Sequence, residues 1–261
     1  MSLAITIKCI DGIVLASDTR LSVEVRNNNY VFMNHFDSAK KLFSLGGVHN
    51  HVGILVYGLV SIKNRAIHNF IPELTLELGH KRLLTILDYA KRISSFFQNK
   101  WEKMMPLDYN GPEVCFVVCG YDPLELYGKI FHFALPFHGQ PKPNMEGDSQ
   151  FGLTFGGDVG IINRLVGGFD PLLFEDIKKN QNISPEGKNE ILKDMQSKYR
   201  LQIPFDIFSL QDAINLARTL ISTTISLKKL TIGPDVVGGD IEVMVIRNTT
   251  DVEFISKKEI V

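Results

Sequence analysis

The order of strand-like and helix-like segments constrains the fold of this chain more than any other feature. Apolar stretches at Leu3 to Cys9 and Ile13 to Ser17 flank the turn pair Asp11-Gly12 and predict a β-hairpin. More strands, two helical patterns, further strands, another helical pattern and a last hairpin follow, without regular β–α–β alternation. This order favours helices layered on antiparallel sheets. We therefore expect an α+β fold, a four-layer αββα sandwich of two antiparallel sheets flanked by helices.

The spacing of apolar residues gives the expected position of each element. Helical spacing runs over residues 59–78, interrupted at Pro72, and over residues 83–104, which end before Pro106. Ser209 with Asp212 resembles a capping box and predicts a helix that continues towards Lys228. Besides the first hairpin, strands are expected at residues 41–45, 52–57, 114–119, 129–135, 151–155, 242–246 and 252–255.

Composition indicates one large globular domain over residues 1–261. Of the 261 residues, 44% are apolar and 22% are charged, which is enough apolar material for a full core. The segment from Asn180 to Gln202 is charged, and its apolar positions are sparse. We expect this segment, near residues 180–202, to be a surface insertion.

The charge balance and the cysteines exclude several classes of partner. The 28 basic and 29 acidic residues nearly cancel, so we expect neither nucleic acid nor a membrane as a partner. Apolar runs stay shorter than the roughly 18 residues of a membrane-spanning helix, and we expect a cytoplasmic protein.

Cys9, Cys115 and Cys119 lie in apolar segments and are expected to be reduced core thiols. His49 and His51 are expected at the surface, and neither a metal nor a cofactor is predicted.

Several motifs at a consistent spacing resemble one known family. Residues 2–20 read as a candidate nucleophile, a strand, a turn with glycine, a second strand and then Asp18-Thr-Arg20. Residues 39–45 contain a Lys-Lys-apolar-apolar strand, residues 53–58 form a strand that ends in glycine, and residues 233–246 hold a Gly-Gly turn before a last strand. The chain thereby resembles the proteasome β-subunit-like family of N-terminal-nucleophile hydrolases, and within it the bacterial ancestral β-subunit group.

The resemblance implies a role for each of five residues. Ser2 falls on the position of the nucleophile, Lys41 on the position of the family's lysine, and Asp18 on that of its partner carboxylate. The backbone N–H of Gly58 falls on the oxyanion donor, and Asp235 on the aspartate before the last glycine turn. The chain differs from the family in having serine as nucleophile, a longer segment between Asp18 and Lys41, and Thr154-Phe-Gly-Gly157 where Gly-Ser-Gly is usual.

An N-terminal serine can act without a histidine, because its own α-amino group titrates at about 7.7 to 8 and can accept the hydroxyl proton. Removal of Met1 is expected to expose this group on Ser2. The Gly58 N–H would then stabilise the oxyanion, an effect of about 2.7 to 4 kcal/mol. The implied reaction is acyl transfer through an ester, followed by hydrolysis.

The residues that the resemblance places around the first specificity pocket are all apolar, namely Leu21, Ala39, Phe43, Val56 and Val60. A pocket without charge favours an apolar side chain, because burying an unpaired charge costs several kcal/mol. We therefore expect cleavage after Leu, Phe or Tyr rather than after Arg or Glu.

Three functions are compatible with the motifs. The first is a proteasome-type peptidase acting on peptides or unfolded proteins, assembled as a homo-oligomer through the helices between residues 59 and 104. The second is a catalytically inactive assembly subunit, and the third is an amidase for a small molecule. An unfoldase partner is not identified by the sequence.

Overall fold

A computed structural model describes residues 2–27, 30–82, 85–145, 150–248 and 250–257. Contacts divide the chain into two compact units, one of residues 1–157 with 205–261 and one of residues 158–204. The segment 180–202, which we predicted to be a surface insertion, lies inside the second unit. All residues of the candidate site belong to the first unit.

The first sheet of the first unit has five antiparallel strands in the order β12-β1-β2-β13-β14. Its strands are β1 (Leu3–Cys9), β2 (Gly12–Asp18), β12 (Gly152–Gly157), β13 (Ile241–Ile246) and β14 (Glu253–Ser256). The hairpin predicted around Asp11-Gly12 is confirmed, because Cys9 pairs with Gly12 across the turn. The hairpin places the start of β1 beside the end of β2.

The second sheet also has five antiparallel strands, in the order β11-β10-β9-β6-β5. They are β5 (Leu42–Ser44), β6 (Gly53–Gly58), β9 (Val114–Gly120), β10 (Lys129–Leu135) and β11 (His138–Pro143). Two short strands, β7 (Ser61–Ile62) and β8 (Arg65–Ala66), pair with each other. The 3-10 turns η1 (Gly47–His49) and η2 (Ile67–Phe70) connect neighbouring elements.

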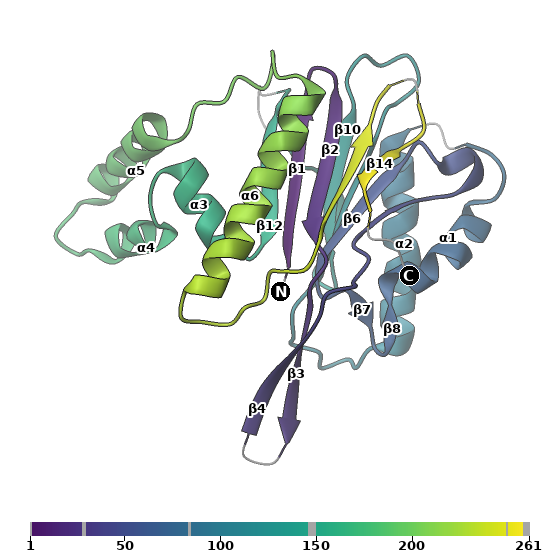
Figure 1. The fold of residues 1–261 in the computed structure, drawn as a ribbon, viewed down its shortest axis with the longest axis horizontal. Coiled ribbons are helices and arrows are strands. Elements are labelled where there is room, and N and C mark those ends of the chain that lie inside the picture. Colours follow the sequence, from purple (N-terminus) through teal and green to yellow (C-terminus); the bar gives the residue numbers. More distant parts are fainter. Residues whose placement is uncertain (1, 28–29, 83–84, 146–149, 249, 258–261) are drawn as a thin grey trace. The chain divides into compact units, whose positions relative to one another are not determined.

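One long helix packs on each sheet (Figure 1). Helix α6 (Leu210–Leu230) contacts β1, β2 and β13, and the predicted Ser209 cap accepts a hydrogen bond from Asp212 N. Helix α2 (Ile86–Met104) contacts β9, β10 and β11, and Thr85 with Asp88 forms its capping box. The expected α+β class with antiparallel sheets and flanking helices is confirmed.

The helix expected over residues 59–78 is shorter than predicted. Residues 61–70 form β7, β8 and η2, and helix α1 (Ile71–Leu78) begins only at Ile71. Pro72 lies in its first turn, where its missing N–H breaks no helical hydrogen bond. Ile67 N donates to Val60 O at 3.0 Å, which stabilises the strand connection upstream of Pro72.

Among the described residues, two apolar clusters contribute to the core of the first unit. One joins α2 to the second sheet, and the rings of Phe97 and Phe116 lie tilted against each other with 4.8 Å between their centroids. The other contains residues of both sheets, among them Leu15 of β2 and Leu55 of β6, so the two sheets pack against each other. The apolar face of α2 is therefore covered within the chain. The association of copies through the helices between residues 59 and 104 stays a prediction.

A two-stranded ribbon lies between the first hairpin and the second sheet. It consists of β3 (Leu21–Asn27) and β4 (Tyr30–Phe36), which pair from Leu21 with Phe36 to Asn27 with Tyr30. Figure 1 shows it extending away from the two sheets. The extra length between Asp18 and Lys41 that the sequence analysis noted is this ribbon.

The second unit consists of helices α3 (Gly160–Gly167), α4 (Pro171–Lys179) and α5 (Pro185–Tyr199). Asp170 and Ser184 cap the last two helices, and each of these has proline in its first turn. Leu201 N donates to Val166 O at 2.8 Å and ties the end of the unit to α3. The charged composition of residues 180–202 reflects the open faces of α5.

Among the described residues, no helix is long and apolar enough to cross a membrane. Cys9, Cys115 and Cys119 are free thiols, two of them buried and Cys115 half-buried. This agrees with the expected core thiols.

Candidate active site

Ser2 lies where the start of β1 meets the end of β2. The antiparallel register pairs Ala4 with Ser17, so Leu3 and Asp18 are adjacent, and Leu3 N donates to Asp18 Oδ1 at 2.9 Å. Ser2 is 1% exposed, and its Oγ has no hydrogen-bond partner in the described part of the chain. A buried hydroxyl without a partner is rare, and it marks Ser2 as a position with a role beyond packing.

The Asp18 carboxylate connects the first strand to Lys41. Its Oδ1 accepts hydrogen bonds from Leu3 N and from Lys41 Nζ, the latter at 2.7 Å. Its Oδ2 accepts from Gly238 N at 3.0 Å and Arg20 N at 3.2 Å. The side chains of Asp18 and Lys41 are 0% and 1% exposed, so this is a fully buried ion pair with four donors on one carboxylate.

Burial lowers the pKa of Lys41, and the charge and hydrogen bond of Asp18 partly oppose this effect. A lysine with a lowered pKa exchanges its proton near neutral pH more readily than an exposed lysine. Lys41 shares an acceptor oxygen with the backbone N–H that follows Ser2. It can therefore supply either a positive charge or a proton next to that residue.

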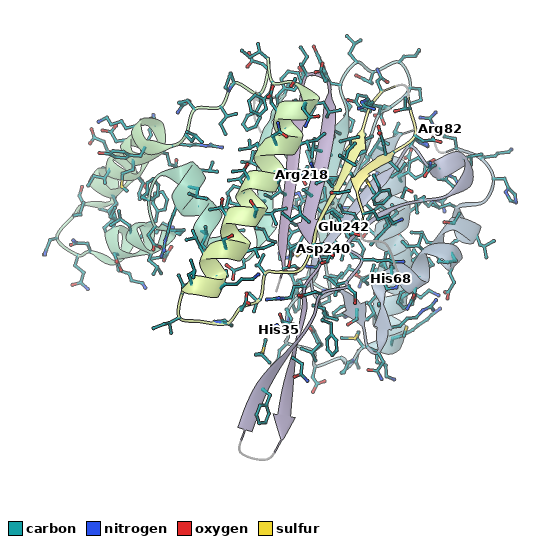
Figure 2. The ribbon with its side chains drawn as sticks, viewed as in Figure 1. His35, His68, Arg82, Arg218, Asp240 and Glu242 are labelled. Carbon is teal, nitrogen blue, oxygen red and sulfur yellow. The ribbon has the colours of Figure 1, made fainter. Side chains whose placement is uncertain are left out.

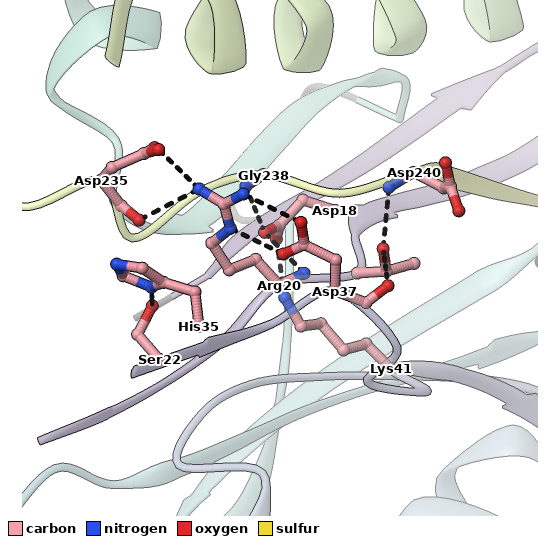
Figure 3. Close-up of polar contacts among 10 residues, drawn as sticks. Asp18, Arg20, Ser22, His35, Asp37, Lys41, Asp235, Gly238 and Asp240 are labelled. Carbon is pink, nitrogen blue, oxygen red and sulfur yellow. Dashed lines mark hydrogen bonds and ion pairs between the residues drawn. The ribbon is translucent and has the colours of Figure 1, made fainter. Parts of the chain in front are cut away.

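Arg20 organises a second set of charges beside this pair (Figure 3). Its guanidinium binds Asp37 through two hydrogen bonds of 2.7 and 2.9 Å, and its Nη1 lies 2.6 Å from Asp235 Oδ2. A guanidinium fork matches a carboxylate in this way, and the hydrogen bond with Asp37 raises the pKa of Arg20. The network therefore connects the residue pair after β2 to Asp37 and to Asp235.

Asp235, which the resemblance places near the nucleophile, contacts Arg20 in this structure. Its other oxygen, Oδ1, is buried and has no hydrogen bond among the described residues. The role of Asp235 at the serine or its amine therefore stays a prediction.

Gly58 ends β6 with a positive φ of 79°. A Cβ at this position would lie 2.4 Å from Glu113 O, so only glycine fits. The preceding residue, Tyr57, has its ring against Gly156, where a Cβ would lie 2.4 Å from the ring. The structure thus brings the end of β6 to the end of β12, and the oxyanion role of the Gly58 N–H stays a prediction.

Gly157 closes the site on the side of β12. Leu3 pairs with Gly157, whose φ is +91°, and a Cβ at Gly157 would lie only 1.7 Å from Ser2 O. Steric crowding therefore explains why glycine occupies position 157, at the end of the Thr154-Phe-Gly-Gly157 segment that stands where the family has Gly-Ser-Gly. This glycine lets the backbone of Ser2 approach β12 closely.

The predicted pocket residues separate into two groups. Phe43, Val56 and Val60 are buried in the core cluster beneath α2, and Leu21 packs against the same cluster. Ala39 is half-buried, and its N–H donates to Thr19 O at 2.9 Å. The structure brings the four larger side chains together, and their service as a substrate pocket stays a prediction.

Two acidic residues of this region were missed by the sequence analysis. Asp37 follows β4 directly and pairs with Arg20. Glu242 on β13 is 3% exposed, and its negative charge partly opposes the lowering of the Lys41 pKa by burial. Figure 2 shows Glu242 with Asp240 at the start of that strand. The signal for Glu242 was a carboxylate inside an otherwise apolar strand, because such a residue is rarely buried without a charged neighbour.

His49 corrects one expectation about the surface. It is 1% exposed, with Nδ1 2.8 Å from Tyr89 Oη and Nε2 3.0 Å from Gly79 O. Because a carbonyl can only accept, Nε2 carries a proton and donates to Gly79 O. Burial, with the charge of Arg82, lowers the pKa of the neighbouring His51 to about 4. No group of acidic, histidine or cysteine side chains in the described ranges is arranged to bind a metal.

Comparisons with known proteins give a fold and correct the family assignment. No family model matches this chain, and no curated protein does. The assignment of the chain to the proteasome β-subunit-like family, which rested on short motifs alone, is therefore wrong.

Among solved structures, the chain is similar to a Gly-1 mutant of Anbu from Hyphomicrobium sp. strain MC1. The identity is 14%, the TM-score is 0.55, and the match covers 99% of this chain and 89% of that one. Anbu is a bacterial protein with a proteasome-like architecture. At this identity the likeness concerns the fold alone, and the chain shares a proteasome-like fold.

Proposed function

We propose that this chain is a hydrolase that cuts peptide bonds with Ser2 as an N-terminal nucleophile, once the bond between Met1 and Ser2 has been cleaved. One observation carries the proposal. The buried Asp18–Lys41 ion pair shares an oxygen with Leu3 N, directly beside a buried Ser2 hydroxyl that has no partner among the described residues. Buried lysines with a shifted pKa beside a candidate nucleophile are found mostly at functional sites.

The reaction follows from these groups. The free α-amino group of Ser2 takes the hydroxyl proton, and Oγ forms a bond with the carbonyl carbon of the substrate. The Gly58 N–H stabilises the resulting oxyanion, the C–N bond breaks, and the leaving amine takes the proton. Water then hydrolyses the ester, releases the acid and restores the Ser2 hydroxyl. Lys41 favours the alkoxide-like state of Oγ through its charge.

The proposed fold is a four-layer αββα sandwich of the N-terminal-nucleophile type. It is supported by the contacts of α6 with the first sheet, of the sheets with each other, and of α2 with the second sheet. The likeness to Anbu supports the same arrangement. The cytoplasmic location stays a prediction from the sequence, in which apolar runs stay shorter than a membrane-spanning helix.

One observation favours the alternative of a catalytically inactive subunit. Ser2 is 1% exposed, so a substrate carbonyl has no open path to its hydroxyl in this conformation. In this alternative the Asp18–Lys41 pair would only fix the register of β1 and β2.

A direct test compares peptide hydrolysis by chains that differ only at Ser2. The protein is released from a cleavable N-terminal fusion so that Ser2 carries a free amino group, which intact mass verifies. We expect turnover of a fluorogenic peptide by the native sequence and by Ser2→Thr, and a loss of at least about 10³-fold in Ser2→Ala. Equal rates in Ser2→Ala, or no turnover with a verified free Ser2, would favour the inactive subunit. Turnover restricted to small amides would favour the amidase.

A further inference from the structure

A small pocket lies between the two sheets of the first unit. Its lining includes Ala4 and Thr6 of β1, Thr154 and Gly156 of β12, Tyr57 of β6, and Asn144, which follows β11. About 20 Å³ of it is open to the centres of water-sized molecules, and a single water needs only about 10 to 15 Å³. The pocket is partly open to solvent, so water can refill it. Its size therefore suits water better than a larger ligand.

The lining of this inter-sheet pocket offers hydroxyl and amide groups, and no charged side chain among the described residues. Thr6 pairs with Thr154 across β1 and β12, so their side chains lie next to each other on one face. Asn144 Nδ2 donates to Thr154 Oγ1 at 2.7 Å, which leaves the hydroxyl hydrogen of Thr154 to donate elsewhere. Thr6 is 2% exposed, and its hydroxyl makes no hydrogen bond to another residue in the described part of the chain. A buried hydroxyl normally has a partner, and a bound water would supply one.

The pocket adjoins the candidate nucleophile. Side chains alternate between the two faces of a strand, so the alternation that directs Ala4 and Thr6 towards the second sheet directs Ser2 to the same face. Two residues of extended chain, about 7 Å, separate Ser2 from Ala4 at the pocket wall. On β12, Gly156 lines the pocket and precedes Gly157, which lies against Ser2 O. On this side, therefore, only glycines and the methyl group of Ala4 lie between the pocket and Ser2.

We propose that the inter-sheet pocket holds the water that hydrolyses the ester on Ser2. Ser2 is 1% exposed, so bulk solvent has little access to an ester on its hydroxyl, whereas the pocket supplies water from inside. The water oxygen forms a bond with the ester carbonyl carbon, and the α-amino group of Ser2 takes one of its protons. The C–Oγ bond then breaks, Oγ receives that proton from the amine, and the acid leaves with the other proton. This step rests on the proposed function, whereas the binding of water does not.

The first test asks whether the pocket holds water, and it needs no turnover. A high-resolution crystal structure of the native chain should show an ordered water at hydrogen-bonding distance from Thr6 Oγ1 and Thr154 Oγ1. Thr6→Ser keeps the hydroxyl and should keep this water, whereas Thr6→Val keeps the shape and should lose it. An empty pocket in the native chain, or an equally ordered water in Thr6→Val, would overturn the proposal.

The second test separates the two halves of the reaction in a chain with a verified free Ser2. An activated ester such as p-nitrophenyl acetate gives a burst of p-nitrophenol on acylation, and then a slower steady phase set by hydrolysis of the acyl-enzyme. We expect Thr6→Val to slow the steady phase about three- to tenfold, the effect of one lost hydrogen bond, without changing the burst rate. Thr6→Ser should retain the native steady phase. Thr224→Val is the matched control, because Thr224 is 0% exposed on α6 and its hydroxyl donates to Leu220 O within that helix.

The possible failures of this second test are distinguishable. A native steady phase in Thr6→Val, or an equal loss in Thr224→Val, would overturn the role of the pocket in hydrolysis. A burst slowed as much as the steady phase would overturn it too, because Thr6 would then only position β1. Absence of a burst in the native chain, despite a verified free Ser2, would refute Ser2 as the nucleophile and with it the hydrolytic role. The crystal structure would still decide whether the pocket binds water.

Discussion

Asp18→Asn tests the buried ion pair with the smallest change of shape. The carboxylate accepts hydrogen bonds from two donors on each oxygen. An amide has only one oxygen, so either of its orientations turns an NH₂ group towards two of the four donors. The substitution also leaves Lys41, which is 1% exposed, without its carboxylate.

The expected loss of stability is about 3 to 5 kcal/mol, the range found when one partner of a buried ion pair is removed. A second estimate gives a loss of the same order, because each of the two buried donors left without an acceptor costs about 1 to 3 kcal/mol. Because burial already lowers the pKa of Lys41, the folded variant binds fewer protons than the unfolded chain. The loss should therefore shrink as pH rises towards 10.5, the ordinary value for lysine.

Urea unfolding followed by tryptophan fluorescence measures this loss in the relevant unit. The chain has one tryptophan, and Trp101 lies buried on α2 of the first unit. Glu253→Gln is the matched control, because it breaks an ion pair with Arg247 that lies in solvent. The side chains of Glu253 and Arg247 are 53% and 43% exposed, so the pair should contribute at most about 1 kcal/mol to the free energy of unfolding. A loss below about 1 kcal/mol in Asp18→Asn, with an unchanged m value, would show that Lys41 does not depend on this carboxylate.

Three further predictions follow from other parts of the first unit. Because burial lowers the pKa of His51 to about 4 in the folded chain, from an ordinary value of about 6.5, the free energy of unfolding should fall as the pH is lowered from 6.5 to 4. The fall should be at most about 2 kcal/mol, since His51 is only half-buried and solvent screens its charge, and unfolding titrations of His51→Gln should lack it. Gly157→Ala should lose at least about 2 kcal/mol in urea unfolding, because its Cβ meets Ser2 O, while Gly46→Ala, with open space around it, should stay within about 0.5 kcal/mol. Peptides ending in Leu, Phe or Tyr should be cut at least about tenfold faster than those ending in Arg or Glu, and equal rates in a fluorogenic assay would place the pocket elsewhere.

The hairpins of the first sheet could be predicted because their signals are local. Asp11-Gly12 specifies a tight turn, and apolar residues on both sides define the strands that it joins. The helix predicted over residues 59–70 was wrong, because apolar residues at helical spacing are also compatible with short strands. The hydrogen bond of Ile67 N with Val60 O favours the strands over the helix. The ribbon was not predicted, although Leu21 and Val23 alternate with polar residues, because the segment was interpreted only as extra length between Asp18 and Lys41.

The site was predictable only in part, for reasons of sequence distance. Asp18 and Lys41 came from a motif resemblance, and the structure joins them directly. The Arg20 network could not be read from the sequence, because Asp235 meets Arg20 from 215 residues away. His49 was expected at the surface since its burial depends on Tyr89, which lies 40 residues further along the chain.

The most direct test of the central claim is covalent trapping of the nucleophile. The chain with a verified free Ser2 is treated with a β-lactone, which opens on a nucleophilic hydroxyl to form a stable ester, and is then digested for peptide mass mapping. We predict one adduct on the peptide that begins with Ser2, absent after Ser2→Ala and slowed by Asp18→Asn. Full reaction elsewhere, or no adduct at Ser2 despite its free amino group, would contradict the claim that Ser2 is the nucleophile.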